Sequence, residues 1–121
     1  MIFGINPISL GAAIGALGVI LGAFGAHAIK GKIGYDLFEI YLTGTQYLMM
    51  HAFAIILYGL SKAEAQWPIW CFLAGILIFT GSLYAITFTG IRTFGAITPI
   101  GGVLFIAGWI GFALQARNLK A

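Results

Sequence analysis

Two histidines are the side chains of this 121-residue sequence that titrate near neutral pH, so metal, haem or proton chemistry would centre on them. His27 and His51 both lie in long apolar stretches. If these stretches form antiparallel helices in a membrane, His27 lies about 2–4 Å and His51 about 16 Å below the same boundary. Because Zn–N bonds are about 2.0 Å long, that difference in depth prevents both rings from binding one ion. We therefore predict no metal site and no cofactor.

Hydrogen bonding inside a helical bundle is the more economical role for both histidines, because buried polar groups are nearly always paired. His27 is expected to bond to Gln46 or Tyr47, and His51 to Tyr47 or to a facing hydroxyl. The predicted buried polar cluster comprises His27, Gln46, Tyr47, His51, Ser82 and Tyr84.

Nucleophilic catalysis needs a base that is oriented by an acid, and the acidic residues are badly placed for that role. Asp36, Glu39 and Glu64 all lie outside or at the ends of the apolar stretches, where the membrane interfaces would be. The sequence also has no Walker-type phosphate loop. We predict no catalytic residue and a non-enzymatic protein.

The elements that must position these side chains are four apolar runs, in a chain that is 61% hydrophobic and only 7% charged. An ordinary soluble domain has about 25% charged residues. A helix of about 20 apolar residues crosses a hydrocarbon layer about 30 Å thick, and a helix satisfies its own backbone polar groups there. The prediction is an all-α integral membrane bundle, one domain over residues 1–121, with four transmembrane helices in two antiparallel hairpins. The expected helices cover residues 8–29, 36–61, 68–88 and 98–117.

Glycines recur in the first run at spacings of 4, 3, 4 and 3 residues. At 100° per residue they fall within about 80° of one another, which forms a stripe without side chains. Such stripes let helices approach closely in a membrane, where van der Waals packing drives association. The glycines predicted to pack against neighbouring helices are Gly11, Gly15, Gly18, Gly22, Gly25, Gly101 and Gly108.

Local signals predict where the later helices begin. Asp36 and Glu39 have the spacing of a capping box, which places the start of the second helix at Asp36. Pro68 suits the first position of the third helix. Thr98 and Pro99 fit the N-cap and first position of the fourth.

Four short motifs follow one another along nearly the full length of the chain: LGAFGAHA (residues 21–28), Y-x-x-x-H-A (47–52), GSLYA (81–85) and GAITPIGG (95–102). Together they resemble the YgdD-like family of small bacterial inner-membrane proteins, a former domain-of-unknown-function family with a mitochondrial counterpart in animals. The chain departs from the family at Gln46 and Met50, where members often have a basic residue and a tyrosine. The resemblance implies a four-helix multi-pass protein of the bacterial inner membrane. It implies no activity.

Three functions are open on these grounds. The preferred one is a non-enzymatic membrane protein that acts through helix packing, with membrane lipid, a second copy of the chain or another membrane protein as partner. The alternatives are an oligomeric transporter or channel for a small solute or proton, and a histidine-dependent membrane enzyme or haem protein. The six Lys and Arg residues, among them Lys120, lie outside the runs or at their ends, which favours interfacial anchoring and excludes a nucleic-acid partner. They divide three and three between the two ends of the bundle, so orientation is not predicted.

Overall fold

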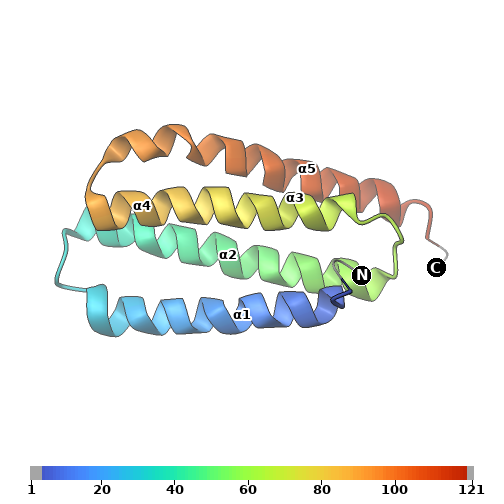
Figure 1. Cartoon of the computed structure of the whole chain (residues 1–121), viewed down its shortest axis with the longest axis horizontal. Coiled ribbons are helices and arrows are strands. Elements are labelled where there is room, and N and C mark those ends of the chain that lie inside the picture. The colour runs from blue at the N-terminus through green and yellow to red at the C-terminus, as the bar shows by residue number, and fades with distance from the viewer. Residues whose placement is uncertain (1–3, 120–121) are drawn as a thin grey trace.

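The computed structural model describes residues 4–119, and within them the chain is all helical. The long helical rods run antiparallel and form two hairpins (Figure 1). All four are long and apolar enough to cross a membrane: Pro7–Ile29, Tyr35–Ser61, Trp67–Thr89 and Arg92–Ala116. The predicted fold class, an all-α bundle of four transmembrane helices, is confirmed. Lys120, one of the predicted anchors, lies outside the described residues.

The first hairpin joins α1 (Pro7–Phe24) to α2 (Tyr35–Ser61), and α1 ends in a π-helical turn, η1 (Gly25–Ile29). The Asn6 side chain accepts a hydrogen bond of 2.8 Å from the backbone N–H of Ile8, so it caps the start of α1. Proline at the beginning of α1 lacks the N–H that a first turn cannot use.

The second hairpin begins with one rod that the structure divides into three consecutive parts. They are α3 (Trp67–Gly75), the π-helical turn η2 (Ile76–Thr80) and α4 (Gly81–Thr89). Gly90, in the left-handed conformation with φ 73°, ends α4. A 3₁₀ turn, η3 (Arg92–Ala96), leads to α5 (Thr98–Ala116).

The predicted capping box at Asp36 and Glu39 is wrong. Helix α2 begins at Tyr35, its N-cap is Gly34, and no side chain caps it. The Asp36 carboxylate instead forms an ion pair with Arg92, which lies in the turn that precedes α5. The acid therefore links the two loops at this end of the bundle rather than the first turn of its own helix.

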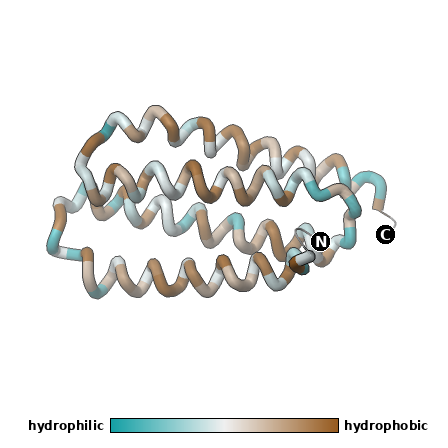
Figure 2. Tube along the Cα trace, in the orientation of Figure 1, coloured by the Kyte–Doolittle hydropathy of each residue, from teal (hydrophilic) through white to brown (hydrophobic). Residues whose placement is uncertain are grey.

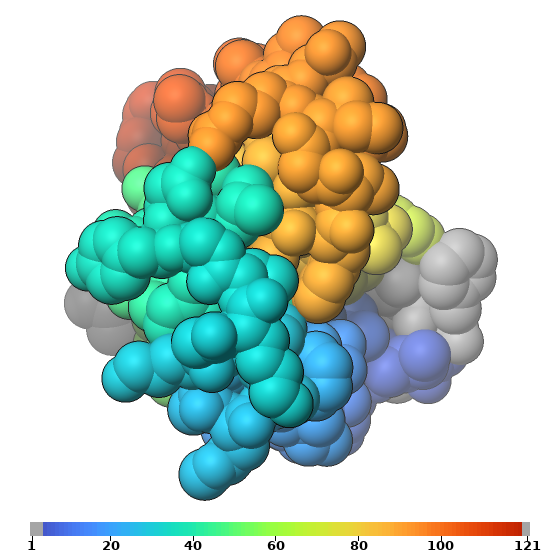
Figure 3. All heavy atoms as spheres, turned by 90° about the vertical axis from the view of Figure 1, so that its left-hand side faces the viewer, coloured from blue at the N-terminus to red at the C-terminus, as the bar shows by residue number. Residues whose placement is uncertain are grey.

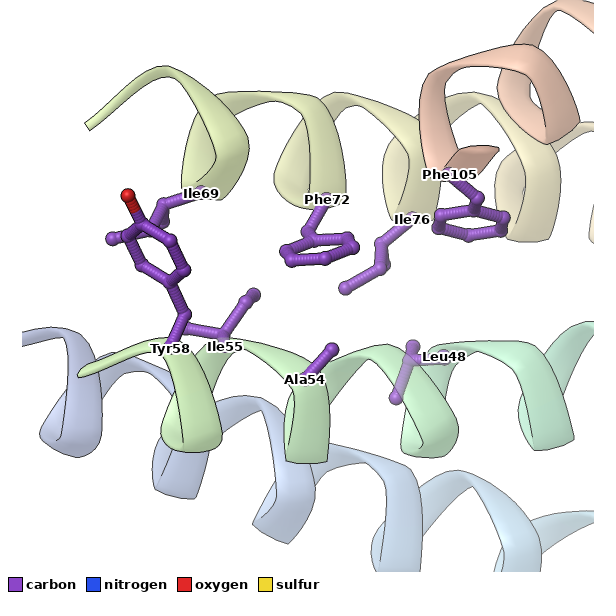
Figure 4. Close-up of a cluster of buried hydrophobic side chains, with 8 residues drawn as sticks. All are labelled: Leu48, Ala54, Ile55, Tyr58, Ile69, Phe72, Ile76 and Phe105. Carbon is purple, nitrogen blue, oxygen red and sulfur yellow. The ribbon is translucent and has the colours of Figure 1, made fainter. Parts of the chain in front are cut away.

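Two rods form the centre of the bundle and two lie outside them. Seen from one end, α2 and the α3–η2–α4 rod lie side by side, with α1 and α5 on opposite sides of this pair (Figure 3). Helix α1 packs mainly on α2, whereas α5 packs mainly on α3 and η2. Figure 4 shows the core between α2 and the α3–η2–α4 rod, where apolar side chains of both meet together with one ring from α5. Its members are Leu48, Ala54, Ile55, Tyr58, Ile69, Phe72, Ile76 and Phe105.

The outer surface is as apolar as the core. Val19, Ile20, Leu77 and Val103 are each at least 64% exposed. Figure 2 shows hydrophobic colour along the middle of the rods and hydrophilic colour at the two ends of the bundle. A surface of this kind suits hydrocarbon rather than water.

Candidate functional site

His51 is enclosed by aromatic rings from three helices. It lies in the middle of α2 and is 2% exposed. Its ring stacks on Phe105 of α5, with ring centroids 3.6 Å apart and planes 10° apart. Phe72 of α3 lies 5.8 Å away and Trp109 of α5 meets the ring edge-on at 5.9 Å. These contacts fix the plane of the imidazole.

Both nitrogens of this imidazole have partners. Nδ1 lies 2.7 Å from the backbone oxygen of Tyr47, and the indole N–H of Trp109 donates to Nε2 over 3.1 Å. A carbonyl can only accept and an indole N–H can only donate. Nδ1 therefore carries the hydrogen and Nε2 the lone pair, which is the neutral form of His51 in a single tautomer. For the ring to bind a metal or take up a proton at Nε2, Trp109 would first have to move.

The predicted hydroxyl donor to His51 is wrong, because Trp109 fills that position. Tyr47 contributes its carbonyl, and its ring packs against Phe79 and Phe105, with centroids 4.6 and 6.1 Å away. Trp109 is not among the site residues predicted from the sequence. It is 58 residues from His51, and nothing in the local pattern connects the two.

The predicted contacts of His27 and Gln46 are also wrong. Both side chains are exposed, and neither makes a hydrogen bond to another residue within 4–119. Both side chains are exposed because of how their helices are rotated about their own axes. Gly25 and Ile29 are the residues of η1 that are buried against α2, and His27, midway between them in this turn, is exposed on the other side. Gln46 lies on the face of α2 that no other helix covers.

Tyr84 belongs to a second polar cluster, which joins α1, α2 and α4. Its hydroxyl lies 2.5 Å from the Thr45 hydroxyl, and Thr45 donates to the backbone oxygen of Tyr41 over 3.0 Å. Since Thr45 uses its hydrogen there, Tyr84 is the donor of the first bond. The Tyr41 ring stacks on Tyr84 at 4.7 Å, and its hydroxyl donates to the carbonyl of Leu21 in α1. Tyr84 is thus bonded to Thr45 and not to His51, although the sequence predicted both in one buried polar cluster.

Hydroxyls of the α3–η2–α4 rod also bond across helices. Thr80 donates to the carbonyl of Gly44 over 2.9 Å, at a point where the glycine brings α2 close to Tyr84. Thr87 donates to its own helix at Leu83 and lies 3.3 Å from the carbonyl of Leu37. The two central rods are therefore held by side-chain bonds to backbone oxygens.

Ser82, near the start of α4, bonds to the start of α5 rather than to the histidines. It donates to the carbonyl of Phe79 over 2.8 Å and lies 2.5 Å from the Thr98 hydroxyl, which must then be the donor to Ser82. The predicted N-cap role of Thr98 is wrong, because Ile97 occupies the N-cap position of α5. The Thr98 hydroxyl bonds to the neighbouring helix instead.

The glycine stripe of α1 divides between two faces. A Cβ at Gly11 or Gly18 would lie within 3.0 Å of α2, and Gly25 packs directly against the Tyr41 ring. At Gly15 and Gly22 no atom lies within 4 Å of that position. Of these five glycines, only the three that are spaced seven residues apart lie in the α1–α2 contact.

The predicted packing glycines of α5 contact the neighbouring rod. A Cβ at Gly101 would meet the backbone nitrogen of Phe79 at 2.5 Å, and one at Gly108 would meet the Phe72 ring at 2.6 Å. Gly101 thus lies against backbone, which cannot move aside as a side chain can.

A hollow of about 330 Å³ lies over His51 on the outer side of the bundle. Its lining is almost wholly aromatic and aliphatic: Tyr47, Met50, His51, Phe79, Gly102, Phe105, Ile106 and Trp109. Across the described part of the chain, His, Cys, Asp and Glu side chains nowhere gather in a group of three that could hold a metal ion. Buried side-chain nitrogen and oxygen atoms in the same part all have hydrogen-bond partners. The polar groups of this interior therefore hold the helices in register.

Four membrane-length helices with an apolar outer surface define a multi-pass membrane protein. Residues 21–102 match the family described as a protein of unknown function, DUF423, and the chain belongs to this family. A UPF0382 membrane protein of Staphylococcus aureus is 43% identical over 107 residues, which cover 85% of this chain and 88% of the relative. The UPF0382 membrane protein YwdK of Bacillus subtilis is 42% identical over 117 residues, or 90% of this chain and 94% of the relative. No solved structure matches the chain.

Proposed function

We propose that this protein is a non-enzymatic protein of the bacterial cell membrane that works by associating with other transmembrane helices, first of all those of a second copy of itself. The observation that carries this proposal is Gln46. Its amide is exposed on the membrane-facing surface of α2, 11 residues after the helix begins, and has no hydrogen-bond partner within residues 4–119. Hydrocarbon offers no partner to an amide, so a second protein surface is the natural source of one.

The surface around Gln46 supports the proposal. Leu10, Ile14 and Leu17 line the groove between α1 and α3, which places Gly15 and Gly22 on the opposite flank of α1. Both glycines are open, so that another helix could approach the backbone there.

Gln46 lies beside this open flank of α1. In α2, Gln46 lies between Tyr41, which contacts Gly25, and Leu48, which contacts Gly18. Gln46 is therefore near the level of Gly22, which lies between Gly18 and Gly25. On α2, Gln46 and the exposed Phe53 point in nearly the same direction, since they are seven residues apart. We name Gly15, Gly22, Gln46 and Phe53 the outer face of the first hairpin.

A second copy suits this face because a two-fold axis brings the same residues of both copies together. An amide both donates and accepts, so that two Gln46 side chains can satisfy each other. Glycines seven residues apart favour a left-handed crossing of the kind found in most membrane bundles.

The test compares glycines of one helix that differ only in the face they occupy. In liposomes, fluorescence transfer between labelled copies should fall to the background of a monomeric membrane protein in Gly22→Leu and Gln46→Leu. The melting temperature in detergent should stay unchanged, because both positions are open in the monomer. Gly18→Leu is the matched control, which should lower the melting temperature. Transfer that is absent in the native protein, or equal in native and variant proteins, would refute the proposal.

A further inference from the structure

A pocket of about 440 Å³ lies where the α1–α2 loop meets the first turns of α2. Lys30 directly follows the first membrane span, and the second span begins at Tyr35, so the pocket lies at the membrane boundary. Its size is within the range of pockets that hold small ligands, roughly 300–1,000 Å³.

The pocket has an apolar floor and a charged rim. Ile33, Phe38 and Leu42 form the floor, and Leu42 lies one turn deeper in α2 than Phe38, toward the hydrocarbon. Lys30, Glu39 and Tyr35, whose hydroxyl bonds to Glu39, form the rim, and their side chains are exposed. Among residues 4–119 the ion pair is that of Arg92 with Asp36, so neither rim charge is neutralised by a partner of opposite sign.

We propose that this pocket binds a phospholipid whose head group carries both a phosphate and a primary ammonium, as in phosphatidylethanolamine. The Lys30 ammonium would bind the phosphate, and the Glu39 carboxylate would accept hydrogen bonds from the lipid ammonium. The acyl chains would continue along Phe38 and Leu42 into the bilayer. A purely anionic head group fits less well, because Glu39 on the same rim repels it.

The experiment is native mass spectrometry of the full chain from mild detergent, with dioleoyl phosphatidylethanolamine, phosphatidylcholine and phosphatidylglycerol added in equal amounts. Phosphatidylethanolamine should be retained most. Lys30→Ala and Glu39→Gln should each lower its retention about two- to fivefold, the range for exposed charge pairs. Lys62→Ala is the matched control at the other end of the bundle, where Lys62 lines a different pocket, and retention should not change.

The relative retention of the three lipids also distinguishes the ways in which the proposal could be wrong. Equal retention of the ethanolamine and choline lipids overturns it, because a quaternary ammonium has no N–H to donate to Glu39. Preferred retention of phosphatidylglycerol, raised further by Glu39→Gln, overturns it in favour of a simple anion site. Melting temperatures equal to that of the native protein establish that the variants are folded. The residues that line the pocket are not those of the outer face of the first hairpin, but Leu42 precedes Gln46 by one turn of α2. Lipid retention is therefore compared in the monomer peak of the native mass spectrum, so loss of self-association leaves this result unaffected.

Discussion

Helix α2 packs on its two sides by different means. Toward α1 the contact depends mainly on missing side chains, since Gly11, Gly18 and Gly25 let the helices approach closely, and the Tyr41 hydroxyl adds one hydrogen bond to the carbonyl of Leu21. Toward α3, α4 and α5 it depends on particular side chains, such as His51 with its aromatic neighbours and Thr80 with its bond to α2.

This difference determines how each side can be broken. The α1 side is sensitive to added atoms, because atoms of α2 already fill the space that a Cβ on Gly11, Gly18 or Gly25 would need. The other side is sensitive to removed atoms, because a buried polar group left without its partner costs free energy. Three substitutions test this comparison, in order of expected effect.

Gly11→Leu should have the largest effect. An added Cβ would lie 2.5 Å from Ile56 Cγ1 and 2.8 Å from the backbone oxygen of Ala52, so the two helices must separate. Overpacking of this kind typically costs about 1–3 kcal/mol of unfolding free energy. Unfolding of detergent-solubilised protein by denaturant would measure it. Gly15→Leu, on the open face of the same helix, is the control; equal losses in both variants would remove the distinction between the faces.

Trp109→Phe should have an intermediate effect, because it removes the N–H that bonds to Nε2 of His51 but keeps an aromatic ring. The unpaired nitrogen should lower the unfolding free energy by about 1 kcal/mol. Combining this change with His51→Phe removes both polar partners, and the double variant should lose less than the sum of the single ones. Strict additivity in this cycle would show that the bond contributes nothing to stability.

Thr80→Val should have the smallest effect of the three. It keeps the shape of the side chain and deletes one hydrogen bond to the carbonyl of Gly44, a change worth about 0.6 kcal/mol between membrane helices. Thr43→Val in α2 deletes only an exposed bond to the carbonyl of Glu39 in its own helix and should be neutral. If the two valine variants melt at the same temperature, the interhelical bond does not stabilise the bundle.

The sequence predicted the fold class well and the partners of individual side chains poorly. Length and composition of the apolar runs were sufficient for four transmembrane helices, and Pro68 at the start of α3 follows its local preference. The prediction that His27 is buried is wrong because its exposure depends on which side of η1 meets α2. All five glycines follow the same regular spacing, so the sequence did not show that Gly15 and Gly22 would have no neighbouring helix.

What the sequence determined by itself is the solvent and the secondary structure, because a long apolar run must close its own backbone hydrogen bonds in hydrocarbon, and a helix does this without help from the rest of the chain. What only the tertiary structure decided is the rotation of each helix about its axis. One residue changes the direction of a side chain by 100°, and packing of all four helices together fixes that angle. For this reason Trp109 became the partner of His51, and Gln46 was left facing the membrane.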